Sequence, residues 1–510
     1  MRNKYNKGKM YKKIIYKSVL FVALMLSCSS CKKYLSLYPQ DGVIRQEFWQ
    51  NKEQIQSAVI GIYSSLLADP AGKDRQLAEY LFLWGELRAD NVVSSGANIS
   101  NDELNMLHDN ILSTNSVVNW SAVYRTINYC NTVLDYAPNV MSLDKTLTQD
   151  KLNSYLGEAL AIRSLMYFYL VRTYRDVPLK LKSTSSDTDI QQLAVTKSTD
   201  VLAQIVKDLA TAEQYTVYTY GDKASDKGRI TKYTINAIQA DVYLWMEDYN
   251  NSITACDKII NSGQFGLVPG DSGFFSTLYY TGNSIESIFE FQFDVQALNS
   301  FYTAFQQKAR FAASPNLMDL VYTVDYNDDN NYDRRGRFVA VNTSTNQIWK
   351  YIGVSGDRNA RTIDQSYAHY MIYRYADVLL MKAEAMAYVN RGSESLDIIR
   401  TIRTRANALA TTLESPSPSD ANAVALYVLD ERDREFSFEG KRWYDLLRYA
   451  KRNNFQNLNT LILASTINIP GNLQQSANTK LRDLNSLYLP IPYSETLNDP
   501  NLVQNPFYKN

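Results

Sequence analysis

Apolar residues recur at helical spacing along most of the chain. In Leu156–Tyr174 ("LGEALAIRSLMYFYLVRTY") they return every three or four residues, at Leu156, Ala159, Leu160, Tyr167 and Leu170. This spacing places apolar side chains on one face of an α-helix, with Arg163 on the same face. The segment therefore predicts a long amphipathic helix that packs against a core.

Two further stretches predict helical hairpins. "INAIQADVYLWM" and "ADVLLMKAEAMAYV" are followed by polar breaks, at Glu247–Asn251 and Asn390–Ser393, and then by "SITACDKIINSG" and "SLDIIRTIRTRANA". Paired helices of this kind are loosely similar to tetratricopeptide repeats, although the period is irregular. We predict a mainly α fold, with a helical-hairpin scaffold over about residues 40–264 and 362–510.

The helical pattern is interrupted over about residues 265–361. This part is rich in Gly, Asn, Asp, Tyr and Phe, which predicts an irregular, loop-rich region carrying short strands. Polar segments at Leu181–Thr199 and Glu414–Asn422 predict surface loops. Because binding groups are found disproportionately in loops on a rigid scaffold, we expect ligand contacts in the loop-rich parts.

One segment, Glu435–Arg452 ("EFSFEGKRWYDLLRYAKR"), is dense in charge. Counting back from it, one helix face carries Val424, Val428, Glu431, Glu435 and Phe438. Two carboxylates thus lie on an apolar stripe, where an unpaired ion would be costly. Their expected partners are Arg432, Arg434, Lys441, Arg442 and Arg448.

Gly440 can adopt the positive φ that ends a helix, and Asp445 and Arg448 can pair on the helix expected after it. We predict a structural ion network made of Glu431, Arg432, Arg434, Glu435, Glu439, Arg442, Asp445 and Arg448. A glycosidase would instead need one carboxyl kept protonated as an acid. Neighbouring arginines favour the ionised form, so the network is the better interpretation of these residues than catalysis.

Charge separates the first 27 residues from the rest of the chain. The whole sequence has 53 basic and 53 acidic residues, but the first 27 hold seven basic and no acidic residues, which leaves 46 against 53, or −7. A chain with this balance has no basic stripe to follow phosphates, so we expect no nucleic-acid partner. The basic start, the short apolar run Ser18–Leu26 and the small residues after it predict a secretory signal peptide over residues 1–27.

Cysteines at the end of this leader predict a lipid anchor. Cys28 directly follows "MLS", a good match to a bacterial lipobox, whose cysteine is acylated, whereas Cys31 follows the more polar "CSS". The alternative is that Cys28 and Cys31 pair or remain free. We predict lipidation at Cys28, with Cys31 as the alternative, and a single mature domain over residues 28–510.

Signals for metals, cofactors and other catalysis are weak. Only two histidines exist, His108 and His369, which excludes a three-histidine zinc site. "GDSG" at Gly270–Gly273 would need a histidine partner and a β-barrel to act as a protease nucleophile loop. Asp325–Asp333 has the first spacings of a calcium loop but lacks its Gly and Glu, so we expect a solvated turn. We predict no metal, no cofactor and buried thiols at Cys130 and Cys256.

Five segments, in this order, resemble motifs of the SusD/RagB lipoproteins of the Bacteroidetes outer membrane. They are "KKYLSLYPQDGVIRQEFWQN", "GEALAIRSLMYFYLVRTYRDVPL", "YRYADVLLMKAEA", "ERDREFSFEGKRWYDLLRYAK" and "LPIPYSETLNDPNLVQNPFY". Together they span nearly all of the mature chain. Two positions depart from the family pattern, Ser36 where Asp is common and Phe507 where the usual ending has Gly.

The resemblance implies a cell-surface lipoprotein whose tetratricopeptide-like helices support a more irregular region. It implies a SusC-like TonB-dependent transporter as partner and a glycan as ligand, or a peptide in the RagB branch. The family's lipidated cysteine usually lies just before the "KKYL"-like segment, which points to Cys31, whereas lipobox chemistry favours Cys28. Two rival functions remain, a secreted glycan hydrolase and a purely structural helical adaptor.

The shared motifs are scaffold motifs and transfer no ligand residues. A glycan site needs exposed aromatic rings with polar groups at their edges, and Tyr supplies contact area at low entropic cost. Most of the 38 Tyr residues are expected to pack in the scaffold. For Trp349, a strand position that faces the core is as well supported as a ligand contact. The candidates in the loop-rich segments are Asp90, Asn91, Asn98, Asn101, Tyr279, Tyr280, Tyr302 and Trp349.

Overall fold

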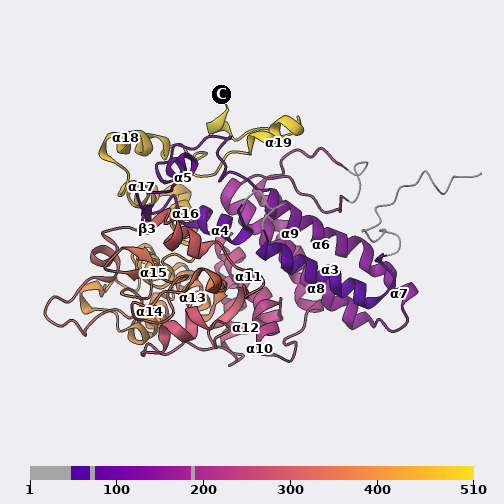
Figure 1. The fold of residues 1–510 in the computed structure, drawn as a ribbon, viewed down its shortest axis with the longest axis horizontal. Coiled ribbons are helices and arrows are strands. Elements are labelled where there is room, and N and C mark those ends of the chain that lie inside the picture. Colours follow the sequence, from indigo (N-terminus) through magenta and orange to yellow (C-terminus); the bar gives the residue numbers. More distant parts are fainter. Residues whose placement is uncertain (1–47, 69–74, 185–189, 510) are drawn as a thin grey trace, which may run out of the picture. The chain divides into compact units, whose positions relative to one another are not determined.

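Long helices joined by turns and loops dominate the computed structural model (Figure 1). It describes residues 48–68, 75–184 and 190–509, and residues 51–510 form one compact unit. The mainly α prediction is confirmed. The predicted signal peptide and the lipidation candidates Cys28 and Cys31 lie outside the described residues.

Helix α8 (Gln149–Tyr174) is the central element of the first helical group. The predicted helix Leu156–Tyr174 forms its C-terminal part, and every residue from Gly157 to Tyr174 is buried because α6 and α9 pack against it. Thr148 caps the start of the helix, because its Oγ1 accepts a hydrogen bond from the Lys151 N–H at 3.3 Å. The remaining helices of this group are α3 (Lys52–Leu67), α4 (Leu77–Glu86), α5 (Asn101–Leu107), α6 (Ser121–Tyr136), α7 (Val140–Leu143) and α9 (Ser198–Tyr215).

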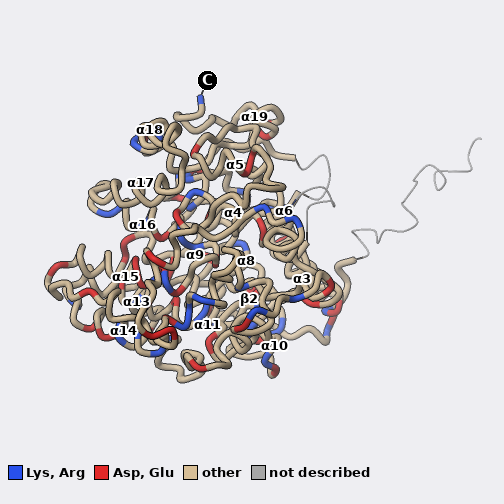
Figure 2. Tube along the Cα trace, turned by 60° about the vertical axis from the view of Figure 1, so that its left-hand side comes forward, with Lys and Arg blue, Asp and Glu red and all other residues tan. Residues whose placement is uncertain are grey.

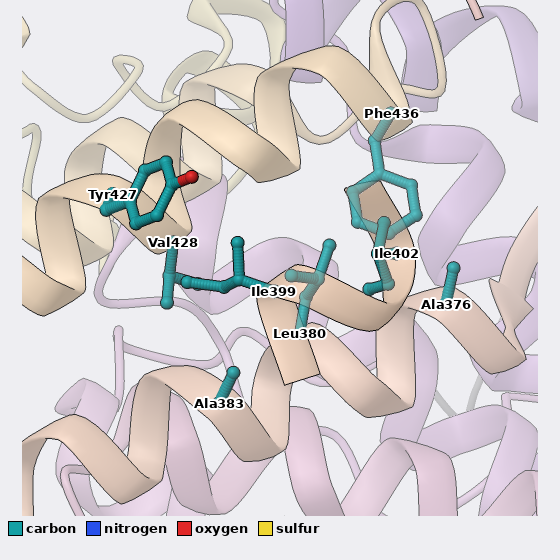
Figure 3. Packing of buried hydrophobic residues seen from close by; sticks show 8 residues of the cluster. All are labelled: Ala376, Leu380, Ala383, Ile399, Ile402, Tyr427, Val428 and Phe436. Atoms are coloured by element: carbon teal, nitrogen blue, oxygen red, sulfur yellow. The ribbon is translucent and has the colours of Figure 1, made fainter. Parts of the chain in front are cut away.

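Both predicted hairpins are present. They are α11 (Lys232–Trp245) with α12 (Tyr249–Ile260), and α13 (Tyr375–Tyr388) with α14 (Gly392–Ala406). Helix α15 (Ala421–Phe436) packs on the second hairpin, and Figure 3 shows the apolar side chains that meet between the three helices. This cluster consists of Ala376, Leu380, Ala383, Ile399, Ile402, Tyr427, Val428 and Phe436.

The segment 265–361 is irregular and carries short strands, as predicted. The antiparallel strand pairs are β1 (Val92–Ser94) with β3 (Phe311–Ala313), β2 (Ser287–Phe291) with β6 (Tyr370–Arg374), and β4 (Val341–Asn342) with β5 (Gln347–Ile348). Short π-helical turns lie between the strands, at η3 (Ser276–Tyr280), η4 (Thr303–Gln307) and η5 (Met318–Tyr322). Because β1 and β6 belong to the helical parts of the sequence, backbone hydrogen bonds tie the loop-rich region to the scaffold.

The C-terminal helices cover one end of the first helical group. They are α16 (Arg442–Phe455), α17 (Leu458–Thr466), α18 (Gly471–Lys480) and α19 (Tyr493–Asn498). The Leu489 N–H donates to the Thr173 carbonyl at 2.8 Å, which fixes this segment to the end of α8. Within the described ranges, no helix has the length and apolar character needed to cross a bilayer.

The junction between α15 and α16 differs from the expected helix face. Helix α15 ends at Phe436, so Phe438 does not continue the stripe of Glu431 and Glu435, and its φ is +68°. Gly440 has the predicted positive φ, +72°, but it lies beyond the helix end. The helix ends earlier because the segment turns to pack on α4, where a Cβ added to Gly85 would lie 1.9 Å from the Gly440 carbonyl oxygen.

Candidate functional site

The charged segment around α15 forms a buried ion cluster. Glu435 has no exposed side-chain surface and is bound by Arg374 Nη1 at 2.6 Å, Arg405 Nη2 at 2.5 Å and Arg335 Nη1 at 2.9 Å. Figure 2 shows basic and acidic segments interleaved around α13 and α15. An interior carboxylate is thus surrounded by three guanidinium groups.

Glu431 and Glu439 extend this cluster in two directions. Glu431 pairs with Arg335 at 2.7 Å, Arg434 at 3.0 Å and Arg403 at 3.1 Å. Glu439 pairs with Lys350 at 2.7 Å and Arg374 at 3.0 Å. Arg335 and Arg374 each contact two of the three glutamates, so the ion pairs form one network.

The remaining predicted members pair around α16. Arg432 lies 2.8 Å from Asp377 and 2.9 Å from Asp445. Arg448 lies 2.6 Å from Glu384 and 2.8 Å from Asp445, the i, i+3 pair expected from the sequence. Arg442 contacts Asp90 at 2.7 Å and Asp433 at 3.1 Å.

The partners expected for the two glutamates need correction. Of the five expected cations, only Arg434 is an ion-pair partner of Glu431, and none is a partner of Glu435. Arg432 sits on another face of α15 and meets Asp377 and Asp445 there. The true partners Arg335, Arg374, Arg403 and Arg405 come from segments distant in sequence, and no local spacing signals them.

Burial and neighbouring cations shift the pKa values of the buried carboxyls in opposite directions. Burial alone would raise the pKa of Glu435, but Arg405, Arg374 and Arg335 together hold it well below its ordinary value. Glu86, on α4, has no ion-pair partner among the described residues, and burial raises its pKa to about 8. Its Oε1 accepts from the Gly440 N–H at 2.7 Å and the Lys441 N–H at 3.2 Å, which links α4 to the junction before α16. The network therefore has the properties of a scaffold.

Four of the predicted ligand residues have scaffold contacts instead. Asn91 is 1% exposed and donates to Asp433 at 2.7 Å, and Tyr279 is 6% exposed and donates to Glu439 at 3.2 Å. Trp349 is 1% exposed and follows strand β5, so the alternative that it faces the core is correct. Asp90 is bound through both carboxylate oxygens by Arg442. Because their polar groups already have partners in the scaffold, these contacts do not favour ligand binding by these four residues.

The other four predicted ligand residues lie at the surface. Asn98 and Asn101 are exposed, on the loop after β1 and at the start of α5. Tyr302 is half-buried, and its N–H donates to Ser366 Oγ at 3.2 Å just before η4. Tyr280 is also half-buried. Contacts from β1 to β3, and from β3 to η4, lead from the segment of the two asparagines toward Tyr302.

Tyr280 and Tyr367 are held by one arginine, and we call these three residues the Tyr280 platform. The Arg361 guanidinium lies 4.3 Å from the Tyr280 ring centroid and 5.2 Å from that of Tyr367. It donates to the Tyr280 carbonyl at 3.0 Å and to the Gln365 carbonyl at 3.2 Å. Tyr367 is half-buried like Tyr280, so two partly exposed rings share a rigid base.

The base of this platform is electrostatically unusual. Arg361 is 2% exposed, no described carboxylate pairs with it, and its Nε has no hydrogen-bond partner among the described residues. Burial lowers its pKa to about 10, so it stays charged at neutral pH. The exposed side chains of Thr362 and Asp364 lie beside it in sequence. Arg361 and Tyr367 escaped the sequence prediction because "RTIDQSYAHY" shows no periodicity or motif.

The weaker motifs have local structural roles. Asp325 accepts from the Asn327 N–H at 2.9 Å and from Asn331 Nδ2 at 2.8 Å, which orders an exposed turn. Over the described ranges, no group of His, Cys, Asp and Glu side chains is arranged to hold a metal ion. His369 Nδ1 lies 2.5 Å from Glu290. Cys130 and Cys256 are buried free thiols, as predicted.

Comparison with family models places both halves of the chain in one group of proteins. A model described as "SusD family" matches residues 274–508. A second model, described as "Starch-binding associating with outer membrane", matches residues 44–244. Together the two matches include the loop-rich region and both parts of the helical scaffold.

Individual proteins show the same relationship. A SusD-like protein of Formosa agariphila is 24% identical over 493 residues, which cover 87% of this chain and 92% of that protein. The solved structure of a SusD superfamily protein of Bacteroides vulgatus superposes with a TM-score of 0.71 at 23% identity, covering 90% of this chain and 100% of the other. A SusD-like carbohydrate-binding protein of Bacteroides fragilis gives 0.70 at 18% identity, covering 89% and 100%. At these identities the solved structures establish the fold.

Proposed function

Because this chain belongs to the SusD/RagB family, we propose that it is an outer-membrane lipoprotein that captures glycans and delivers them to a SusC-like TonB-dependent transporter. The model that matches residues 44–244 is described as "Starch-binding associating with outer membrane", which supports the glycan and the location. The signal peptide and lipobox of the sequence support export and anchoring. Binding without catalysis is the activity proposed for the chain.

The Tyr280 platform is the observation that carries the glycan assignment. Sugar rings present flat C–H faces, which stack on aromatic rings, and hydroxyl groups, which bond to polar side chains at the edges. Tyr280 and Tyr367 offer two partly exposed rings, and Arg361 fixes both in place. Rings that are already ordered lose little entropy when a ligand binds.

The buried acids support a binder over a hydrolase. Glycoside hydrolysis needs two carboxyl groups in an open cleft, one of them protonated. Glu431, Glu435 and Glu439 are buried, and arginine and lysine side chains surround them. Arginine partners favour the ionised form, so these glutamates are poor general acids.

Calorimetric titration of the mature protein with oligosaccharides of several polysaccharide classes tests this function. We expect binding without product release, and Tyr280→Ala or Tyr367→Ala should weaken it by about tenfold. Tyr326→Ala is the matched control, because Tyr326 is 84% exposed on another loop and should leave the affinity unchanged. Unchanged affinity in both platform variants would exclude the platform as the site.

The same titration distinguishes the competing functions. Released product would identify a hydrolase, and binding of peptides without binding of any glycan would favour the RagB-like alternative. Delivery requires a separate measurement, co-purification of a TonB-dependent barrel with the affinity-tagged protein from outer membranes. Absence of any such barrel from the purified material would contradict the transporter assignment.

A further inference from the structure

A groove lies beside the short helix α10 (Lys223–Gly228) and shares no residue with the Tyr280 platform. We call it the α10 groove. It has a volume of about 590 Å³, and none of the platform residues lines it. Its principal lining residues are Tyr218, Lys227, Tyr233, Gln264, Phe265 and Ile285. Figure 2 shows α10 beside β2, which it contacts.

Three aromatic rings form one wall of this groove. The ring centroids of Tyr218 and Tyr233 lie 5.2 Å apart, and those of Tyr233 and Phe265 also lie 5.2 Å apart. Tyr218 is 57% exposed, and the other two are half-buried. Tyr218 and Tyr233 are tilted by 50°, and Tyr233 and Phe265 by 80°, so each ring can meet the flat apolar face of a different sugar unit. Thr219, Asp222 and Gln264, which also line the groove, supply hydroxyl, carboxylate and amide groups for sugar hydroxyls.

Lys227 is a buried cation without a counter-ion. It is 9% exposed, and its Nζ lies 4.2 Å above the Phe265 ring centroid. Among the described residues, Nζ has no ion-pair or hydrogen-bond partner. A buried ammonium without a partner is costly, and burial lowers its pKa to about 8.

The nearest acids, Asp226 and Glu290, form no ion pair with Lys227 and bond to other groups. Asp226 accepts from Thr219 Oγ1 at 2.7 Å and from the Tyr220 N–H at 2.6 Å. Glu290 accepts from the Asn283 N–H at 3.0 Å and lies 2.5 Å from His369 Nδ1. The groove therefore holds an unpaired positive charge at the end of an aromatic wall.

We propose that the α10 groove binds a saccharide that carries a carboxylate, such as a uronic acid unit. The sugar faces stack on Tyr218, Tyr233 and Phe265, and the carboxylate pairs with Lys227. A uronic acid carries its carboxylate on the same ring whose face can stack, so one unit can meet both Lys227 and the aromatic rings. This site adds a second saccharide subsite to the proposed function and does not depend on the Tyr280 platform.

Titration of the mature protein with tetramers of galacturonate, glucuronate and mannuronate, and with neutral tetramers of galactose, glucose and mannose, tests the proposal. At least one acidic tetramer should bind more tightly than its neutral counterpart. Lys227→Met should weaken that binding by roughly thirtyfold, because it leaves the carboxylate unpaired. Tyr218→Ala should weaken it by about tenfold.

Matched controls separate this site from general effects. Lys207→Met removes an exposed charge from α9, outside the groove lining, and should leave the affinity within about twofold. Lys227→Met should not lower the thermal unfolding midpoint, because it removes a buried unpaired charge. If no acidic tetramer binds, or if Lys227→Met binds as well as the wild type, the proposal is wrong. Acidic binding lost in Tyr280→Ala but kept in Lys227→Met would reject the α10 groove and leave the proposed function intact.

Discussion

At the scale of single residues, two buried glutamates show how neighbours decide the state of a carboxyl group. Glu435 and Glu86 are both fully buried, but three guanidinium groups surround Glu435, whereas two backbone N–H groups bind one oxygen of Glu86. The second oxygen of Glu86 has no partner among the described residues. The same substitution at the two positions should therefore have very different consequences for stability.

Glu435→Gln should destabilise the fold by about 3–5 kcal/mol, because it leaves buried arginines without their carboxylate. The wild-type contribution is complete above the ordinary carboxyl pKa and is lost as pH falls through the lowered pKa of Glu435. Differential scanning calorimetry should show a lower unfolding midpoint, while the remaining folded protein keeps its ligand affinity. Glu394→Gln is the control, because its pair with Arg391 is exposed and contributes little. A fully stable variant that has lost ligand binding would overturn the structural assignment.

Glu86→Gln should leave stability at pH 7 within about 1 kcal/mol, because the amide oxygen can accept the same two N–H bonds. In the wild type, burial raises the pKa of Glu86 to about 8 from 4.5. The folded state therefore binds a proton that the unfolded state has released, and stability falls as pH rises from 4.5 to about 8. Unfolding midpoints measured across this window should decline less in the variant. An identical pH dependence in both proteins would contradict the raised pKa.

At the scale of elements, the contact between α4 and the segment before α16 leaves no room for side chains. Gly85 and Gly440 meet there, and the Glu86 carboxylate next to Gly85 accepts from the Gly440 N–H. Gly61 of α3 offers a contrast, because a Cβ added there would meet no atom within 4 Å. Gly61 and Gly85 both lie within helices, and they differ in the atoms that surround them.

Gly85→Ala should destabilise the protein by about 1–3 kcal/mol or more, because the backbone at Gly440 must move. Gly61→Ala should instead stabilise it by about 0.5–1 kcal/mol, since Ala has the higher helix propensity and the space is free. The two unfolding midpoints should shift in opposite directions. Equal shifts would show that the contact between α4 and Gly440 is looser than the structure indicates.

At the scale of the whole molecule, the interior depends on residues that are far apart in sequence. Asp90 and Arg442 are separated by 352 positions and form a bidentate pair at 2.8 and 2.7 Å. Strand β2 of the loop-rich region pairs with β6 at the entrance to α13. The surface that carries Tyr280 is therefore supported by the helical scaffold, which suits a protein that presents a rigid binding face.

The proposed lipid anchor also concerns the whole molecule, and its test centres on Cys28. Cys28→Ala should abolish incorporation of labelled palmitate and leave the protein out of the membrane fraction. Cys31→Ala should retain the label. The reverse pattern would establish Cys31, the position that the family resemblance implies, and labelling of both variants would exclude a single acceptor.

The local pattern of residues was sufficient to predict the helices and the presence of an ion network. Amphipathic spacing predicted α8 and both hairpins because helix periodicity is a property of neighbouring residues. The same spacing placed Glu431 and Glu435 on a buried face, where they had to be paired. The composition of residues 265–361 predicted their irregular character, because Gly, Asn and aromatic residues without helical spacing do not form long helices.

Only the tertiary structure decided which groups meet and which remain exposed. Arg374 and Arg335 reach Glu435 from 61 and 100 residues away, so no local rule could select them over Arg432 or Arg448. Tyr279 and Tyr280 are adjacent in sequence, but one donates to buried Glu439 while the other stacks at the surface on Arg361. Pairing and exposure depend on how distant segments pack, whereas periodicity is already present in the chain.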